Sequence, residues 1–379
     1  MRTQSIHDFE QTTRILSDPD EPLTAAVIYS LSNISEDDFA QLALGWTSYP
    51  VERRRQLIRR LGELSEVNFE VNFDAVNLLA LEDPDWEVRV AAIEGLWENE
   101  SVSLMRHLIA LSTSDPITEV RAAAVSALGR FILLGELGKF PEAEATLAQD
   151  AALDLLNQAD EHIDVRRRAL EAIANCGREG LSELIEEAYM EPSLKMRASA
   201  LFAMGRSCDT RWRSIILDEL EGDEPELLYE AARAAGELEL SAAVGRLARL
   251  LTHEDREVQE MAVWALGEIG NPRARRLLED AAETAPDEAF AEAVEEALEN
   301  AYLVSDGLRF EMFDFAEAHH NGSRYDAYDE PDEDDDGDID DEDIDDEDID
   351  DEDDDAFDDD YEDDDLDDLE GDEREDWRW

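Results

Sequence analysis

One short phrase recurs along most of the chain and limits what the chain can fold into. It begins with Val-Arg or an equivalent pair, continues with small residues at fixed offsets and often closes on Leu-Gly, as in residues 120–129 and 258–267. The arginine position recurs at intervals of 31 to 45 residues. It is occupied by Arg54, Arg89, Arg121, Arg166, Arg197, Leu228, Gln259 and Ala291. A period of this length indicates stacked units, none of which can bury its own apolar surface.

The apolar residues inside the phrase have helical spacing. In one copy they form a single stripe with a period of 3.6 residues: Val120, Ala124, Ala127, Leu128 and Phe131. A breaker of proline and acidic residues precedes most copies, as at 83–85, and a second amphipathic segment precedes the breaker, as at 242–251. Proline and carboxylates both suit the first turn of a helix. We therefore predict an all-α fold, a right-handed α-solenoid of about eight helical hairpins followed by a disordered acidic C-terminal tail.

The repeat also suggests how the chain is divided. We expect an N-terminal segment with a capping helix near 22–31 (1–35), a repeat solenoid (36–304), a C-terminal cap or linker (305–325) and a polyacidic tail (326–379). The longest interval, 45 residues, contains an insertion. We expect it to lengthen the second helix of one hairpin and the loop that follows. Such insertions are often used for binding, although a merely tolerated insertion fits as well.

At this phrase the chain resembles the HEAT-repeat proteins, in particular their short-repeat, phycobilin-lyase-like branch. The resemblance implies an α-solenoid with a surface for partners, and a ladder in which the arginine of each second helix pairs with an aspartate of the turn before it. Asp83 or Asp85 would then pair with Arg89, and Asp115 with Arg121. The residues expected in this ladder are Arg54, Arg89, Arg121, Arg166, Arg197, Asp85 and Asp115. The ladder should break where the anchor is Leu228, Gln259 or Ala291. The resemblance is specific for fold and weak for function.

Charge and composition exclude several classes of function. The formal net charge is −69, and residues 326–379 hold 37 of the 101 acidic residues but two of the 32 basic ones. Binding to nucleic-acid backbone or anionic lipid needs basic surface, so we expect neither. No apolar run approaches the ~20 residues of a membrane span, and the first residues do not resemble a signal peptide. With two cysteines and no leader, the expected location is the cytoplasm.

Candidate catalytic chemistry is sparse. Deoxyhypusine hydroxylases resemble this fold and bind iron through repeated His-Glu steps, whereas this chain has one such step, His253-Glu254, in a turn. Cys176 and Cys208 lie about one repeat apart near the ends of second helices, and we expect buried apolar residues there rather than reactive thiols. No nucleophile–base pair can be identified. We predict no catalytic residue, no cofactor and no metal site.

Arginine clusters and tryptophans leave alternatives open. The clusters at 53–60, 166–168 and 273–276 could bind a partner, but the many acidic residues favour ion pairs within the chain. Trp86, Trp97 and Trp264 fall within or beside second helices. Burial in the core is the favoured interpretation, and exposed interface anchors are the alternative.

The acidic tail has too little apolar surface to fold, and its charges repel one another. It contains three tandem Asp-Ile-Asp-Asp-Glu copies at 338–352, and a partial match to a calcium loop from Asp332 that we attribute to the acidic composition. Aromatic and aliphatic residues among the acids are candidates for binding a partner: Phe357, Tyr361, Leu366, Leu369, Trp377 and Trp379. A solubilising brush and halophilic adaptation are alternative interpretations of the tail.

The predicted function is a non-enzymatic scaffold or adaptor for protein–protein interaction. Its solenoid face would hold one partner, and its tail would attract a partner with a basic surface. One alternative is a phycobilin-lyase-like or otherwise catalytic solenoid. Another is a tail that mimics nucleic acid.

Overall fold

The computed structural model describes residues 9–305, with side chains placed as far as Leu303. Within this range the regular elements are eighteen α-helices and three short 3-10 helices, without a strand. The predicted all-α solenoid of helical hairpins is confirmed. The predicted cap or linker beyond residue 305 and the predicted disordered tail lie outside the described residues.

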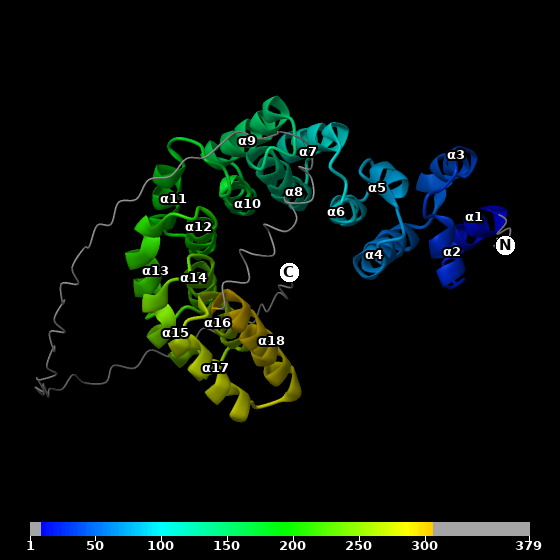
Figure 1. The fold of residues 1–379 in the computed structure, drawn as a ribbon. Helices are drawn as coiled ribbons and strands as arrows, with labels where there is room; N and C mark the ends of the chain where they lie inside the picture. Colours follow the sequence, from blue (N-terminus) through cyan, green and yellow to red (C-terminus); the bar gives the residue numbers. More distant parts are fainter. Residues whose placement is uncertain (1–8, 306–379) are drawn as a thin grey trace, which may run out of the picture. The chain divides into compact units, whose positions relative to one another are not determined.

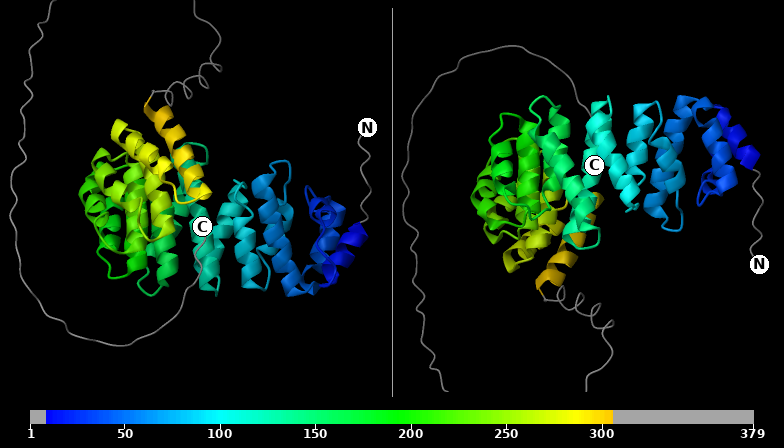
Figure 2. Two further views of the ribbon diagram at one scale, coloured as in Figure 1. Left: turned by 90° about the horizontal axis from the view of Figure 1, so that it is seen from below. Right: turned by 90° about the horizontal axis from the view of Figure 1, so that it is seen from above.

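Two short helices, α1 (Phe9–Ser17) and α2 (Ala25–Ser30), precede eight helical hairpins that follow one another in a curved row (Figures 1 and 2). The first helix of each hairpin lies on the outer side of the curve. These outer helices are α3 (Glu36–Gly45), α5 (Asp74–Ala80), α7 (Val102–Ser114), α9 (Glu142–Asn157), α11 (Leu181–Tyr189), α13 (Arg213–Glu219), α15 (Val244–Leu250) and α17 (Pro272–Glu283). The inner helices are α4 (Val51–Val67), α6 (Trp86–Glu94), α8 (Thr118–Glu136), α10 (Ile163–Ile173), α12 (Leu194–Arg206), α14 (Pro225–Glu237), α16 (Arg256–Ile269) and α18 (Glu288–Ser305).

One continuous core runs along the row between the outer and inner helices. In α8 the predicted stripe supplies Val120, Ala124, Leu128 and Phe131, all fully buried, while Ala127 is half-buried. Each inner helix packs against the inner helices before and after it, so no hairpin completes its core alone.

The glycine eight positions after the anchor allows consecutive inner helices to approach closely. A Cβ added at Gly129, Gly205, Gly236 or Gly267 would lie 2.9 to 3.1 Å from the Cα of an alanine on the next inner helix. These alanines are Ala172, Ala234, Ala265 and Ala297, respectively. Real Cβ atoms are essentially never closer than about 3 Å to such an atom, so the small residues set the spacing of the inner helices.

The insertion expected from the 45-residue interval is accommodated in helices. Helix α8 has 19 residues and α9 has 16, and residues 137–141 alone connect them. The expected longer loop is therefore wrong, because the additional residues lengthen both helices. The rings of Phe131 and Phe140 pack 5.2 Å apart between their centroids and hold the connection against α8.

The two ends of the described row are closed in different ways. At the N-terminal end, the buried guanidinium of Arg53 on α4 donates hydrogen bonds to the carbonyl oxygens of Asp18 and Glu21, in the loop between α1 and α2. In α18 the buried side includes Phe290 and Val294. Its exposed residues include Glu292, Glu295, Glu296 and Glu299, followed by Tyr302 and Leu303.

We expect Gly267→Ala to lower the free energy of unfolding by about 1–3 kcal/mol, because the new methyl group would meet the backbone of Ala297 at 2.9–3.0 Å. Gly62→Ala in α4 is the matched control, since nothing lies within 4 Å of its added Cβ. It should raise stability by about 0.5–1 kcal/mol through helix propensity alone. Urea denaturation followed by circular dichroism tests both variants, and equal shifts would contradict the close packing of α16 on α18.

Candidate functional site

A ladder of arginines and carboxylates joins successive inner helices. Arg54 on α4 forms a bidentate pair with Asp83, with Nε–Oδ2 and Nη2–Oδ1 distances of 2.7 and 3.0 Å. Arg89 on α6 pairs with Asp115 in the same way, at 2.9 Å for both contacts. All four residues are buried. Bidentate geometry and burial make these stronger contacts than surface ion pairs.

The same aspartates also organise the turns that start the inner helices. Asp83 Oδ1 accepts a hydrogen bond from the backbone N–H of Asp85, and Asp115 Oδ1 accepts one from Ile117. Arg89 in turn donates from Nη1 to the carbonyl oxygen of Asp83 at 2.7 Å. Each buried arginine thus links its own turn, through a carbonyl, to the next turn, through a carboxylate.

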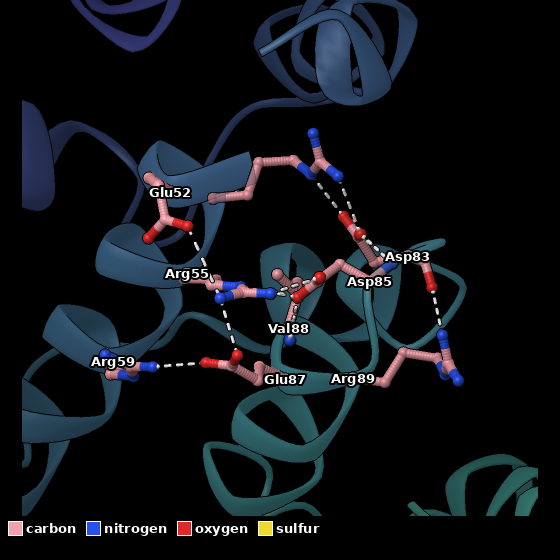
Figure 3. A network of polar contacts seen from close by, with 9 residues as sticks. Glu52, Arg55, Arg59, Asp83, Asp85, Glu87, Val88 and Arg89 are labelled. Carbon is pink, nitrogen blue, oxygen red and sulfur yellow. Dashed lines mark hydrogen bonds and ion pairs between the residues drawn. The ribbon is translucent and has the colours of Figure 1, made fainter. Parts of the chain in front are cut away.

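A more exposed layer of charges surrounds the first step of the ladder (Figure 3). Arg55 lies among Glu52, Asp85 and Glu87, with a 2.7 Å contact between its Nη2 and Asp85 Oδ2. Arg59 contacts the other oxygen of Glu87 at 2.8 Å. The hydrogen bond from Arg55 holds the pKa of Asp85 below its usual value, and Asp85 also caps α6 by accepting from the N–H of Val88.

The pairing expected within a repeat is displaced by one repeat. Arg89 pairs with Asp115 and not with the carboxylate of Asp83 or Asp85, and Arg121 pairs with Glu161 and not with Asp115. Physically, each arginine points along the row toward the following turn and reaches its own turn only through a carbonyl oxygen. Arg166 and Arg197 continue the ladder by pairing with Glu191 and Glu219.

Beyond α12 the anchor positions carry no charge. Leu228 is buried among apolar neighbours, and Gln259 donates its amide hydrogen to the carbonyl oxygen of His253. Arg256, three residues before Gln259, pairs with Asp287 in the next turn at 3.0 Å. Arg256 thus provides a charged link between the turns of the last two hairpins, at a more exposed position.

A second set of residues emerges when positions are counted from each anchor. The fifth residue after the anchor lies on the inner helix, away from the outer helices, and forms a row along the curve. The row consists of Arg59, Glu94, Ser126, Glu171, Phe202, Arg233, Trp264 and Glu296. Two neighbours in this row are in contact, since the guanidinium of Arg233 lies 4.5 Å from the ring centroid of Phe202. Such inner surfaces are the extended binding surfaces of solenoids.

Charged side chains gather around this row on α10, α12 and α14. Glu171 accepts a hydrogen bond from Ser199 at 2.5 Å, and Glu237 contacts both Arg206 and Arg233 at 3.4 Å. Among the described residues, Oε2 of Glu237 is buried without a hydrogen-bond partner.

Glu230 is the most perturbed carboxyl of this group. Its side chain is 19% exposed, its Oε2 lies 3.8 Å from Arg233, and that oxygen accepts no hydrogen bond from any residue in the described range. Burial raises the pKa of Glu230 to about 7, and the negative charges of Glu171 and Glu237 add to the effect against Arg233. The sequence analysis missed this group, although counting from the repeat anchors would have placed Glu230 near the inner row.

The predicted apolar burial holds for one cysteine and fails for the other. Cys176 is buried, whereas Cys208 is exposed in the turn after α12, with a left-handed φ of 52°. Cys176 borders a pocket of about 210 Å³ that Arg178, Ser207 and Trp212 also line. Burial raises the pKa of the Cys176 thiol, which disfavours the reactive thiolate.

The tryptophans and the histidine singled out in the sequence lie at or near the surface. The core interpretation is wrong for Trp86, Trp97 and Trp264, which are 37%, 45% and 38% exposed. His253 is a turn residue whose Nδ1 accepts from the N–H of Asp255. In residues 9–305 no group of three or more histidine, cysteine or acidic side chains could hold a metal ion.

The arginine clusters at 53–60 and 166–168 form ion pairs or hydrogen bonds within the chain. In the third cluster, Arg275 lies over the ring of Tyr302. The six tail residues predicted to bind a partner lie beyond the part of the chain that the structure describes. No helix within residues 9–305 has the length and apolar character needed to cross a membrane.

Two segments, 75–154 and 213–299, match the family model for HEAT repeats. These two segments consist of HEAT repeats. HEAT-repeat solenoids commonly serve as scaffolds for protein interaction. None of the curated proteins matches the sequence.

Solved structures to which the chain is similar include human deoxyhypusine hydroxylase in complex with glycerol, at 21% identity over 78% of this chain and 96% of that chain, with a TM-score of 0.34. The complex of CpcE and CpcF of phycocyanin lyase from Nostoc has 17% identity over 75% and 97% of the two chains and a TM-score of 0.47. Yeast importin-beta, Kap95p, has 15% identity over 78% of this chain and 46% of that chain, with a TM-score of 0.46.

Removing one partner of a buried ladder pair should be far more costly than removing a surface pair. We expect Arg89→Met to lower the free energy of unfolding by about 3 kcal/mol or more, because it leaves the Asp115 carboxylate buried and unpaired. Arg60→Met removes an ion pair of similar chemistry from exposed positions on α4 and should cost less than about 1 kcal/mol. Denaturant midpoints of the two variants measure the difference, and similar values would show that the ladder does not stabilise the repeats.

The raised pKa of Glu230 predicts a pH-dependent stability. Between pH 4.5 and about 7 the folded chain binds more protons at this carboxyl than the unfolded chain, so its contribution to stability is lost as pH rises through this range. Relative to Glu230→Gln, the wild type should therefore lose up to about 3 kcal/mol between pH 4.5 and 8. The groups facing it are Arg168 and Glu171 from α10, and Arg233 and Glu237 from its own helix. A difference between the two proteins that stays constant from pH 4.5 to 8 would contradict the shift.

Proposed function

We propose that this chain is a non-enzymatic protein-interaction scaffold. In this proposal the inner helices of residues 36–304 hold one partner, residues 1–35 and 305–325 close the two ends, and the acidic segment 326–379 attracts basic surfaces. The expected setting is the cytoplasm, in keeping with two cysteines that form no disulfide.

The observation that carries the proposal is the chemistry of the inner helices. They carry a row of side chains that, apart from Ser126, are charged or aromatic, among them Phe202, Arg233 and the exposed Trp264. Aromatic and arginine side chains are the usual anchors of protein interfaces. The carboxylate of Glu230 lies 3.8 Å from Arg233 and adds to the charged groups around this row.

The acidic tail would act as a long-range attractor. Its charges are exposed in any extended conformation and are screened within about 8 Å at physiological ionic strength, so its contribution to affinity depends on salt. Basic proteins would be concentrated near the inner helices by this attraction, and contacts on the helices would then select among them.

The tail can be tested by affinity capture with the full chain and with a variant lacking residues 326–379. We expect the variant to retain fewer basic proteins at low salt, with the difference vanishing as salt is raised. A second variant, in which Asn and Gln replace the acidic residues of 338–352, keeps the length and removes charge. If both variants retain the same proteins with the same salt dependence as the full chain, the tail does not attract partners.

A further inference from the structure

The inner helices α12, α14, α16 and α18 repeat one packing register. Gly205 on α12 faces Ala234 on α14 with the spacing that Gly267 on α16 shows toward Ala297 on α18. Each glycine lies eight positions after its anchor, and each alanine lies six after the next anchor. Residues at equal distances from the anchors therefore occupy equivalent places on successive helices.

In this register one aromatic ring of the row, that of Phe202, is in contact with a cation from the next inner helix. Phe202, five positions after the anchor of α12, is half-buried, and the guanidinium of Arg233 from the same position on α14 lies 4.5 Å from its ring centroid. Arg233 is held there by Glu237, at 3.4 Å, and faces Glu230 at 3.8 Å. This is a complete cation–π site with flanking carboxylates.

The next aromatic ring of the row has no such cation among the described residues. Trp264 occupies the equivalent place on α16, and the equivalent residue on α18 is Glu296, an exposed carboxylate. The ring of Trp264 lies beside Gly236 of α14, where an added Cβ would be 2.8 Å from Cζ3, and the residue is 38% exposed. Phe202 is therefore followed in the row by a guanidinium, that of Arg233, whereas Trp264 is followed by the carboxylate of Glu296.

The charges of the two helices around Trp264 favour an incoming cation. Helices α14 and α16 contain six acidic residues and two arginines, and both arginines already contact carboxylates of the chain. Burial raises the pKa of Tyr229, the negative charge of Glu230 raises it further, and Glu257 and Glu260 lie close enough to add to the effect. The buried Oε2 atoms of Glu230 and Glu237 lack donors from the described residues. This part of the inner surface is short of positive charge.

We propose that the exposed face of Trp264 binds a guanidinium or ammonium group from a basic segment of a protein partner, with Glu296 as its counter-charge. The inference rests on the proposed scaffold function and names one contact of it. The bound cation occupies over Trp264 the place that Arg233 occupies over Phe202. Tryptophan is the best of the aromatic side chains for such a contact.

The test uses the full chain labelled with 5-fluorotryptophan, so that each tryptophan gives its own fluorine NMR signal. Trp264→Phe assigns the signal of interest. The probe is a short arginine-rich peptide, and the same peptide with citrulline in place of arginine keeps the shape and removes the charge. We expect the Trp264 signal to move with the arginine peptide and to stay in place with the citrulline peptide.

Two variants of α18 sharpen the test. Glu296→Arg places a guanidinium at the position on α18 that is equivalent to Arg233 on α14. The peptide concentration needed for the half-maximal shift of the Trp264 signal should then rise about tenfold. Glu295→Arg makes the same charge change at the adjacent exposed position, outside the row, and should change this half-maximal concentration by less than about twofold.

The possible outcomes separate this inference from the proposed function. If the arginine peptide moves the tail signals of Trp377 and Trp379 and leaves Trp264 unchanged, the site is wrong while attraction by the tail stands. If Glu295→Arg weakens the shift as much as Glu296→Arg, bulk charge and not the register explains binding, and the inference is overturned. If no tryptophan signal responds and capture is equal with and without the tail, both proposals fail.

Discussion

The structure depends on the close approach of consecutive inner helices. Glycine and alanine meet at the same two offsets in four contacts between inner helices, those of α8 with α10, α12 with α14, α14 with α16 and α16 with α18. The backbones of the two helices lie so close there that an added methyl group would clash. The contact therefore fixes the position of each inner helix along the next one. Outer helices, turns and surface charges then take positions that recur with each repeat.

The arginine–carboxylate ladder is best developed before these contacts begin, since its buried pairs involve Arg54 on α4 and Arg89 on α6, and a Cβ added at Gly62 of α4 meets nothing within 4 Å. The turn inside the following hairpin lies within reach of each of these arginines, and Asp83 or Asp115 can cap its own turn while pairing with that arginine. Burial makes the pairing costly to break from one side, although it is not by itself a large net gain in stability. The ladder thus favours one order of turns over slipped alternatives. Toward the C-terminal half it weakens, and there the inner surface becomes more acidic.

Periodicity was sufficient to predict the helices, the number of hairpins and the breakers between them, because helical spacing and helix-terminal residues are local signals. An ion-pair partner one repeat away is not a local signal. For this reason Arg89 was expected to pair with Asp83 or Asp85, whereas it pairs with Asp115. Cys208 follows a helix end in a left-handed turn between the polar residues Ser207 and Asp209, and the residue type alone had favoured burial. The exposure of Trp264 could have been predicted by counting five positions from the anchor. The raised pKa of Glu230 could not, because it depends on burial in the packed structure and then on charges that include Glu171, from two hairpins earlier.

The central functional claim is that partners are held by the inner helices. Hydroxyl-radical footprinting of the full chain, with and without a captured partner, tests it most directly, since it reports the solvent exposure of individual side chains. The account predicts that oxidation of Trp264 falls in the complex while oxidation of Met190, which is 68% exposed at the end of the outer helix α11, stays the same. Protection of Met190 with unchanged oxidation of Trp264 would contradict it.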